Sequence, residues 1–144
     1  MDLILMSLVL LFLGLCFGSF AGAQVWRLRA RQLVEDKAEG EEYDKKEYKA
    51  LLPLTKHTTA DDRSQCLRCG HQLAWYDLLP LLSWLRTGGK CRYCHVKIGT
   101  FEPLIELSVA VFFVVSFLFW PQPLATPLDI AQFIIWLIAG VMLA

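Results

Sequence analysis

Two long segments of this sequence carry no charged side chain. They cover residues 3–26 and 107–128, whereas all 14 basic residues lie between Arg27 and Lys97. An uncharged apolar segment of about 20 residues can cross the roughly 30 Å hydrocarbon core of a bilayer as a helix. The chain is 56% hydrophobic, which excludes intrinsic disorder, and its 14 acidic residues balance the bases. The pattern predicts an all-α polytopic membrane protein.

The first transmembrane helix is expected within residues 1–26. Its apolar run begins at Leu3 and ends at Trp26. A cleaved signal peptide is the alternative, because the small residues 21–23 resemble a cleavage site. The amino terminus, however, has Asp2 and no basic residue, and the arginines that follow the run disfavour export of that flank. A retained membrane helix is therefore favoured.

A second transmembrane helix is expected at residues 101–120, where Pro103 is tolerated because it lies in the first turn. An external turn at residues 121–128 follows, and a third helix starts at residue 129. Only 15 residues remain after Asp129, or about 22 Å of helix, which is too short to cross a bilayer. We therefore expect the front part of a longer membrane protein, whose downstream helices complete the bundle.

Basic residues flank both expected spans on the side of the central segment, at Arg27, Arg29, Arg31, Arg92 and Lys97. The external turn has none. Because segments rich in Lys and Arg stay in the cytoplasm, we expect residues 27–100 to be cytoplasmic and the amino terminus to lie outside.

A stripe of glycines marks one face of the first span. Gly14, Gly18 and Gly22 recur every four residues, so they share one side of a helix. Small residues at this spacing let two membrane helices approach closely, although glycine is also common in membrane helices without such a role. We expect this face to pack against a later helix.

A charged linker is expected at residues 27–64. Its segment 35–49 holds seven acids and four bases, with Glu41/Lys45 at the helical i,i+4 spacing. A solvated helix, a linker or an acidic binding surface would each suit this composition. The polar residues 55–64 are a plausible connector to the next unit.

The strongest chemical signal lies in the expected cytoplasmic module, residues 65–100. Two C-x2-C pairs are separated by 21 residues, at Cys66, Cys69, Cys91 and Cys94. Two such pairs suit tetrahedral Zn(II). Disulfides, a redox pair and free buried thiols are alternatives, but a cytoplasmic face is reducing and a redox site needs only one pair. We expect a structural zinc site.

Four thiolates would leave no open coordination position, so this zinc would stabilise the loop rather than catalyse. His71 and His95 adjoin the pairs and are expected around the metal or at the surface. Cys16, alone in the first span, is expected to be a small buried hydrophobe.

Between the pairs, residues 73–85 are too apolar for an ordinary cytoplasmic loop and too short to span a bilayer. Trp75, Tyr76 and Trp84 favour the headgroup level of a membrane, while Asp77 and Pro80 interrupt a continuous helix. Either an interfacial segment or the core of the zinc module would explain this composition.

Glu102 and Glu106 share one helix face near the cytoplasmic entry of the second span. An ionisable residue at this depth suggests a functional role or a polar intramembrane partner, whereas Glu102 also suits a helix amino terminus.

Together these motifs resemble the amino-terminal region of type IV prepilin peptidases. The residues that carry the resemblance are Gly18-Ser19-Phe20 with Arg27, the four cysteines, Tyr76-Asp77-x-x-Pro80-x-x-Ser83-Trp84-Leu85, Gly89-Lys90-Cys91-Arg92-x-Cys94 and Pro103-x-x-Glu106-Leu107. Two positions depart from the family pattern: Leu78 replaces a usual Asn, and residues 99–102 replace the common Ser-x-Arg-Tyr.

The resemblance implies an enzyme of the bacterial inner (plasma) membrane. Such an enzyme cleaves the leader of prepilins or pseudopilins in type IV pilus and type II secretion systems. It then methylates the new terminal amine with S-adenosylmethionine. The resemblance also implies aspartic endopeptidase chemistry, with two carboxylates sharing a proton.

The family's catalytic aspartates lie beyond Ala144, so neither Asp2, Asp77 nor Asp129 is nominated and this chain alone is expected not to act as a hydrolase. It would supply substrate handling and the zinc loop associated with methylation. The substrate-handling candidates are Tyr76, Asp77, Pro80, Ser83, Trp84 and Glu106.

A non-enzymatic membrane adaptor that presents a zinc module to a protein or nucleic acid is the alternative function. Its weakness is charge, because residues 27–100 hold 14 bases and 10 acids, a modest surplus. Strong phosphate tracking needs more basic residues near the cysteines. We therefore expect prepilins and membrane lipid as partners, and no nucleic acid.

Overall fold

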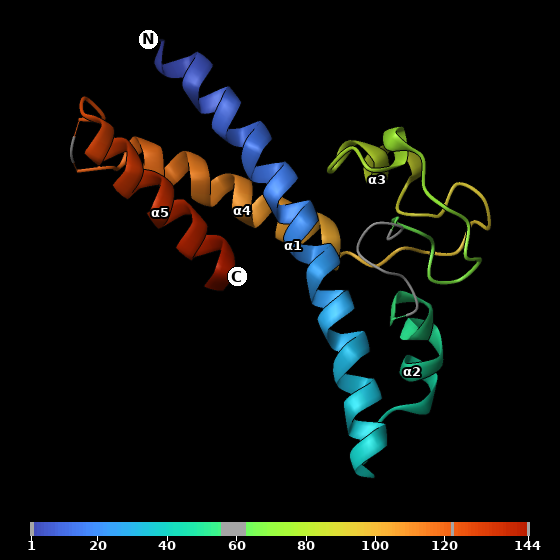
Figure 1. The fold of residues 1–144 in the computed structure, drawn as a ribbon. Coiled ribbons are helices and arrows are strands. Elements are labelled where there is room, and N and C mark those ends of the chain that lie inside the picture. Colours follow the sequence, from blue (N-terminus) through green and yellow to red (C-terminus); the bar gives the residue numbers. More distant parts are fainter. Residues whose placement is uncertain (1, 56–62, 122, 144) are drawn as a thin grey trace. The chain divides into compact units, whose positions relative to one another are not determined.

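The computed structural model describes residues 2–55, 63–121 and 123–143, and these residues are mostly helical without a named strand (Figure 1). The elements are α1 (Leu3–Glu39), α2 (Lys45–Leu51), η1 (Leu52–Thr55), η2 (Trp75–Asp77), α3 (Leu82–Thr87), α4 (Phe101–Leu118) and α5 (Pro127–Leu143). They form two compact units, one from residues 1–21 and 100–144 and the other from residues 22–99. The connector expected at residues 55–64 falls mainly on residues 56–62, outside the described residues.

Among the described residues, two helices, α1 and α4, are long and apolar enough to cross a membrane. α5 is apolar too but has only 17 residues. α1 is 37 residues long and continues past Trp26, where the apolar run ends, as far as Glu39. The membrane-compatible segment is therefore only the first part of a longer helix.

In the first unit, α1 and α4 approach each other through the glycine face. A Cβ atom added to Gly14 would lie 2.5 Å from the Cα of Ala110, and one added to Gly18 would lie 2.6 Å from the Cα of Glu106. Cβ atoms essentially never lie this close to backbone atoms, so a residue with a side chain at either position would clash with α4. The expected packing against a later helix is thus confirmed for two glycines, whereas a Cβ at Gly22 would meet nothing within 4 Å.

α5 packs along α4 and completes the core of this unit (Figure 1). The buried apolar residues come from all three helices: Leu10, Val109, Phe113, Phe133 and Leu137. Close packing is supported by Gly140, which lies against the ring of Phe112, and by the hydrogen bond from Trp136 Nε1 to Ser116 Oγ at 3.0 Å.

The amino terminus of α5 is capped by its own sequence. Thr126 Oγ1 accepts a hydrogen bond from the backbone N–H of Asp129, and the Asp129 carboxylate accepts one from the backbone N–H of Thr126. Pro127 occupies the first helical position, where a missing N–H costs nothing. This reciprocal cap explains why α5 begins at Pro127, earlier than residue 129.

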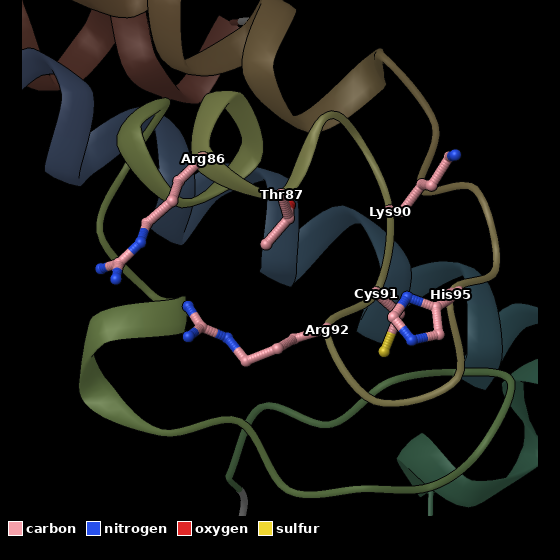
Figure 2. A pocket seen from close by; sticks show the side chains of 6 residues that line it. All are labelled: Arg86, Thr87, Lys90, Cys91, Arg92 and His95. Atoms are coloured by element: carbon pink, nitrogen blue, oxygen red, sulfur yellow. The ribbon is translucent and has the colours of Figure 1, made fainter.

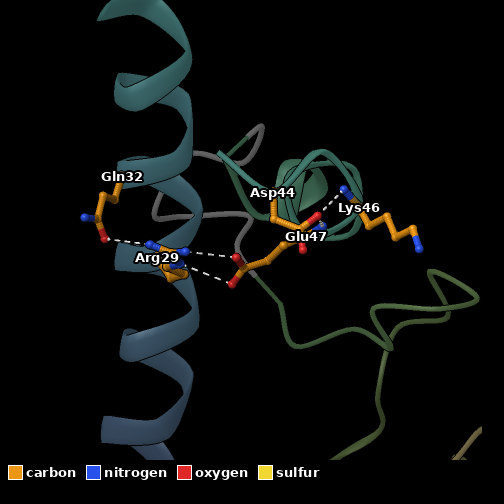
Figure 3. Close-up of polar contacts among 5 residues, drawn as sticks. All are labelled: Arg29, Gln32, Asp44, Lys46 and Glu47. Carbon is orange, nitrogen blue, oxygen red and sulfur yellow. Dashed lines mark hydrogen bonds and ion pairs between the residues drawn. The ribbon is translucent and has the colours of Figure 1, made fainter. Parts of the chain in front are cut away.

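In the second unit, the charged part of α1 packs against α2. Ala30, Leu33 and Leu51 are buried together, so the charged segment carries a narrow apolar stripe. Arg29 also forms a bidentate ion pair with Glu47, with Nε to Oε1 at 3.1 Å and Nη2 to Oε2 at 2.9 Å (Figure 3). Much of the segment expected as a linker is therefore ordered helix.

Residues 40–44 break the helix between α1 and α2. Gly40 has a φ of +77°, which glycine adopts readily. Asp44 then caps α2, because its carboxylate accepts hydrogen bonds from the backbone N–H groups of Lys46 and Glu47 (Figure 3), and these bonds lower the pKa of Asp44. The pair Glu41/Lys45 consequently does not lie on one continuous helix.

Candidate metal centre

The two C-x2-C segments fold into two turns with the same hydrogen-bond pattern. In the first, the carbonyl of Cys66 accepts from the N–H of Gly70, and the N–H of Cys66 donates to the carbonyl of His71. The second turn repeats both bonds 25 residues later. The carbonyl of Cys91 accepts from the N–H of His95, and the N–H of Cys91 donates to the carbonyl of Val96. Isolated bridges Gln65↔Gln72 and Lys90↔Lys97 close the turns. The module is thus a pair of matching cysteine turns.

These turns bring all four predicted ligand sulfurs together. The Sγ atoms of Cys66, Cys69, Cys91 and Cys94 lie within 4.8 Å of one another. Cys66 Sγ and Cys94 Sγ are 3.8 Å apart, which is far beyond the disulfide length of about 2.05 Å. A tetrahedron with Zn–S bonds of about 2.3 Å has S···S edges of about 3.8 Å. The four cysteines are therefore close enough to bind one metal ion.

The ionisation of the thiols also favours a cation. The backbone N–H of Cys94, together with that of Tyr93, lowers the pKa of Cys91 to about 7. The N–H of Val96 acts in the same direction on Cys94, but burial and the neighbouring thiols raise the pKa of Cys94 to about 11. Four thiolates cannot share so small a space without a positive charge between them. A soft divalent ion would relieve this repulsion.

Glycines shape the turns. Gly70 has a φ of +68°, and Gly88 and Gly89 have φ values of +61° and +68°. Gly88 ends α3 in the left-handed conformation. His95 also has a positive φ, +55°, at the place in the second turn that Gly70 holds in the first. No residue pattern around His95 predicts this conformation.

A polar cluster fastens η2 to the second cysteine turn. The carboxylate of Asp77 accepts hydrogen bonds from Arg92 Nε at 2.8 Å and from the Tyr93 hydroxyl at 3.3 Å. The guanidinium of Arg92 also lies 4.8 Å from the centre of the Tyr76 ring. Tyr93 in turn stacks on His71, with ring centroids 3.5 Å apart. This cluster connects the segment between the pairs to both cysteine turns.

Asp77 and Tyr76 are thus placed beside the cysteine module. The side chain of Asp77 is only 7% exposed. Trp84, on α3, donates its indole N–H to the carbonyl of Gly99 at 3.2 Å and packs on Gly89. For Tyr76, Asp77 and Trp84, these contacts support the second explanation of residues 73–85, a role within the zinc module.

Pro80 lies at the interruption that the sequence predicted, and Ser83 lies in the helix that follows. Pro80 separates η2 from α3, and Leu81 between them has a φ of +54°. Ser83 lies in α3, where its carbonyl accepts a hydrogen bond from the Thr87 hydroxyl at 2.9 Å. These two residues shape the backbone of the segment.

Glu106 is found in the other unit. It lies on α4, is 7% exposed, and has its backbone against Gly18. Glu102 lies in the first turn of the same helix, as the sequence implied. A role of Glu106 in substrate handling stays a prediction.

Arg92 and Tyr93 are site residues that were not among the candidates predicted from the sequence. Both lie inside the second C-x2-C pair, and their position there was the only available signal. Nothing in the spacing of Asp77 and Arg92 shows that they meet. Their contact depends on how the chain folds back between the two pairs.

The family model and the similar proteins that this chain matches all point to one family. Residues 12–120 match the family model described as the bacterial peptidase A24 N-terminal domain. The chain is 36% identical over 109 residues to a prepilin leader peptidase/N-methyltransferase of Myxococcus xanthus, covering 76% of this chain and 25% of that protein. A protein of Pseudomonas aeruginosa with the same name is 38% identical over 104 residues, covering 70% and 34%.

A third relative, the type 4 prepilin-like proteins leader peptide-processing enzyme of Escherichia coli, is 34% identical over 131 residues, covering 88% of this chain and 44% of that protein. The chain therefore spans less than half the length of these curated relatives. No solved structure matches it. The matched residues and the identities show that the chain belongs to the bacterial peptidase A24 N-terminal domain family, the amino-terminal region of the prepilin peptidases.

Proposed function

We propose that this chain is the amino-terminal part of a membrane enzyme that removes the leader from prepilins or pseudopilins and methylates the new terminal amine. The observation that carries the proposal is the family match over residues 12–120, supported by relatives named for both activities. The chain's own share would be to hold the substrate beside the membrane. The peptidase step itself would use aspartates outside this sequence.

The cysteine cluster would hold a structural Zn(II) through Cys66, Cys69, Cys91 and Cys94. The sulfur spacing supports a tetrahedral site, and four thiolates leave no position for a reacting water. Zinc would join the two cysteine turns, while Asp77 and Arg92 secure the segment between them. The metal would thereby set the shape of the surface formed by η2 and α3.

That surface is the proposed substrate-handling region. Large apolar side chains project from it: Trp75 is 75% exposed, Leu82 is 63% exposed and Leu85 is 65% exposed. Exposed apolar residues on a polar module are typical of a protein or membrane contact. We propose that this segment lies at the cytoplasmic membrane surface, where it would meet the leader of a prepilin.

Methyl transfer would use S-adenosylmethionine, which supplies the methyl group when bound. No residue of this chain is assigned to that cofactor. The proposed location is the bacterial inner membrane, with α1 and α4 as spans and the cysteine module in the cytoplasm. The apolar lengths of both helices and the position of every basic residue in the central segment support this orientation.

The test uses the complete protein that contains this region. Cys66→Ser, with Cys16→Ser as a matched control, is assayed for cleavage of a model prepilin and, separately, for methylation of the cleaved product. We expect Cys66→Ser to lose bound zinc and to lower at least one of the two activities strongly, while the control retains both. If Cys66→Ser loses its metal and keeps both activities unchanged, the proposed role of the zinc loop is wrong. If the unaltered protein neither cleaves nor methylates, the enzyme assignment fails.

A further inference from the structure

A cavity of about 240 Å³ lies beside the second cysteine turn, and half of its lining residues are cations. The lining consists of Arg86, Thr87, Lys90, Cys91, Arg92 and His95. In Figure 2 the side chains of Arg86 and Arg92 extend to the same side of the view, whereas that of Lys90 extends to the opposite side. Asp77 balances the charge of Arg92, whereas the lining of the cavity holds no acidic residue to balance Arg86 and Lys90. The arrangement suits an anionic ligand.

Arg92, which lines the cavity, also has an unpaired donor. Its Nε atom is held by Asp77 and its guanidinium lies over the Tyr76 ring, so the group has a fixed position. Its Nη2 atom is buried and has no hydrogen-bond partner among the described residues. A buried donor without an acceptor is costly, and the planar guanidinium fork matches the oxygens of a phosphate or carboxylate.

Charge compensation of the metal centre does not account for these cations. A zinc ion with four thiolates carries two negative charges. Residues 65–99 contain five basic side chains, Arg68, Arg86, Lys90, Arg92 and Lys97, against the single carboxylate of Asp77. The module therefore keeps two positive charges in surplus even with the metal bound. Of these five bases, Arg86, Lys90 and Arg92 are the ones that line the cavity.

We propose that the cavity binds a phosphate-type oxyanion, supplied by the headgroup of an anionic phospholipid. The volume is below the roughly 300–1,000 Å³ of pockets for drug-sized ligands, which suits a headgroup. Leu82 lies one helical turn before Arg86 on α3 and is 63% exposed, so an apolar side chain is next to the cationic one. Basic and apolar side chains combined in this way favour an anionic membrane surface.

The position of α3 along the chain agrees with a lipid source. Trp84 of α3 is hydrogen-bonded to the carbonyl of Gly99, and α4, one of the two helices able to cross a membrane, begins at Phe101. In the sequence, Thr100 alone separates Gly99, which accepts this hydrogen bond, from the first residue of that helix. A phosphate dissolved in the cytoplasm would gain nothing from this link or from Leu82.

The test is calorimetric titration of the zinc-loaded chain, purified in a neutral detergent. The probes are dihexanoyl phosphatidylglycerol, dihexanoyl phosphatidylcholine and inorganic phosphate. We expect phosphatidylglycerol to bind about tenfold or more tightly than the other two, because it alone combines net negative charge with acyl chains. Arg86→Gln should weaken its binding by about tenfold, whereas Lys45→Gln, which removes one charge on α2, should leave binding unchanged.

Several outcomes would overturn the proposal. Equal affinity of the unaltered chain for the two lipids would exclude recognition of the anionic headgroup, and equal affinity for inorganic phosphate would exclude a lipid source. Unchanged binding in Arg86→Gln would exclude the cavity. Zinc content is measured in both variants to show that the module remains folded. As a measurement that needs no variant, affinity for phosphatidylglycerol should fall between low and high salt, and a salt-independent affinity would also refute the site.

Discussion

His95 occupies the same position in the second cysteine turn as Gly70 in the first. Both donate their backbone N–H to the carbonyl of the first cysteine of their pair, and both have a positive φ, +55° and +68°. A non-glycine residue pays about 1–2 kcal/mol for this conformation, whereas glycine adopts it freely. The two turns are thus alike in geometry and unequal in strain.

The first prediction concerns this inequality. Gly70→Ala should destabilise the zinc-loaded module by about 1 kcal/mol, because alanine resists a positive φ. His95→Gly should be neutral or slightly stabilising, since relief of strain offsets the greater freedom of the unfolded chain. Thermal unfolding of the two variants measures the difference. If His95→Gly lost more thermal stability than Gly70→Ala, the His95 side chain would make a stabilising contact that outweighs the strain of its backbone.

The second prediction concerns the metal. Cys66→Ser and Cys91→Ser should each release the ion and expose the loop between the pairs to protease, because the remaining three thiolates cannot complete a tetrahedron. Metal analysis and limited proteolysis provide the readouts, with Cys16→Ser as the control. A metal content equal to that of the unaltered chain in both variants would rule out the four-cysteine site.

The third prediction concerns Asp77. Asp77→Asn should destabilise the module by about 1–3 kcal/mol, because Arg92 Nε would lose its charged acceptor and the site is largely buried. By contrast, Glu47→Gln should cost about 0–1 kcal/mol, because its ion pair with Arg29 is 31–40% exposed. Denaturant unfolding of the two variants tests this order. If Asp77→Asn proved harmless, Asp77 would be free for a role in substrate handling instead.

The fourth prediction concerns helix packing in the first unit. Gly18→Leu should separate α1 from α4, since a Cβ there already meets backbone at 2.6 Å. Gly22→Leu should be tolerated, because its Cβ would meet nothing within 4 Å. The readout is the thermal stability of each variant in detergent. Equal stability of the two would contradict the close approach of these helices.

The fifth prediction concerns orientation. Ala125 is exposed between α4 and α5, in a segment that the proposed topology puts outside the cell. Ala125→Cys should react with a membrane-impermeant thiol reagent in intact cells whose outer membrane has been made permeable. Lys49→Cys, on α2, should react only after the inner membrane is opened. The opposite labelling pattern would reverse the topology.

Much of this organisation was predictable because it depends on residues close together in sequence. The uncharged runs predicted the two long helices, and the four-residue repeat of Gly14 and Gly18 predicted a packing face. The paired C-x2-C motifs predicted the cysteine cluster. In each case the spacing along one helix or one turn determines which side chains share a face or point inward.

Other features required the tertiary structure. The continuation of α1 to Glu39 depends on burial of Leu33 against α2, and the positions of Asp77, Arg86 and Arg92 depend on how the chain folds between the two cysteine turns. Charge and hydropathy along the chain do not reveal which distant residues meet. Local spacing therefore defined the helices and the ligand set, whereas long-range packing decided which polar groups were neutralised and which cations were left facing a cavity.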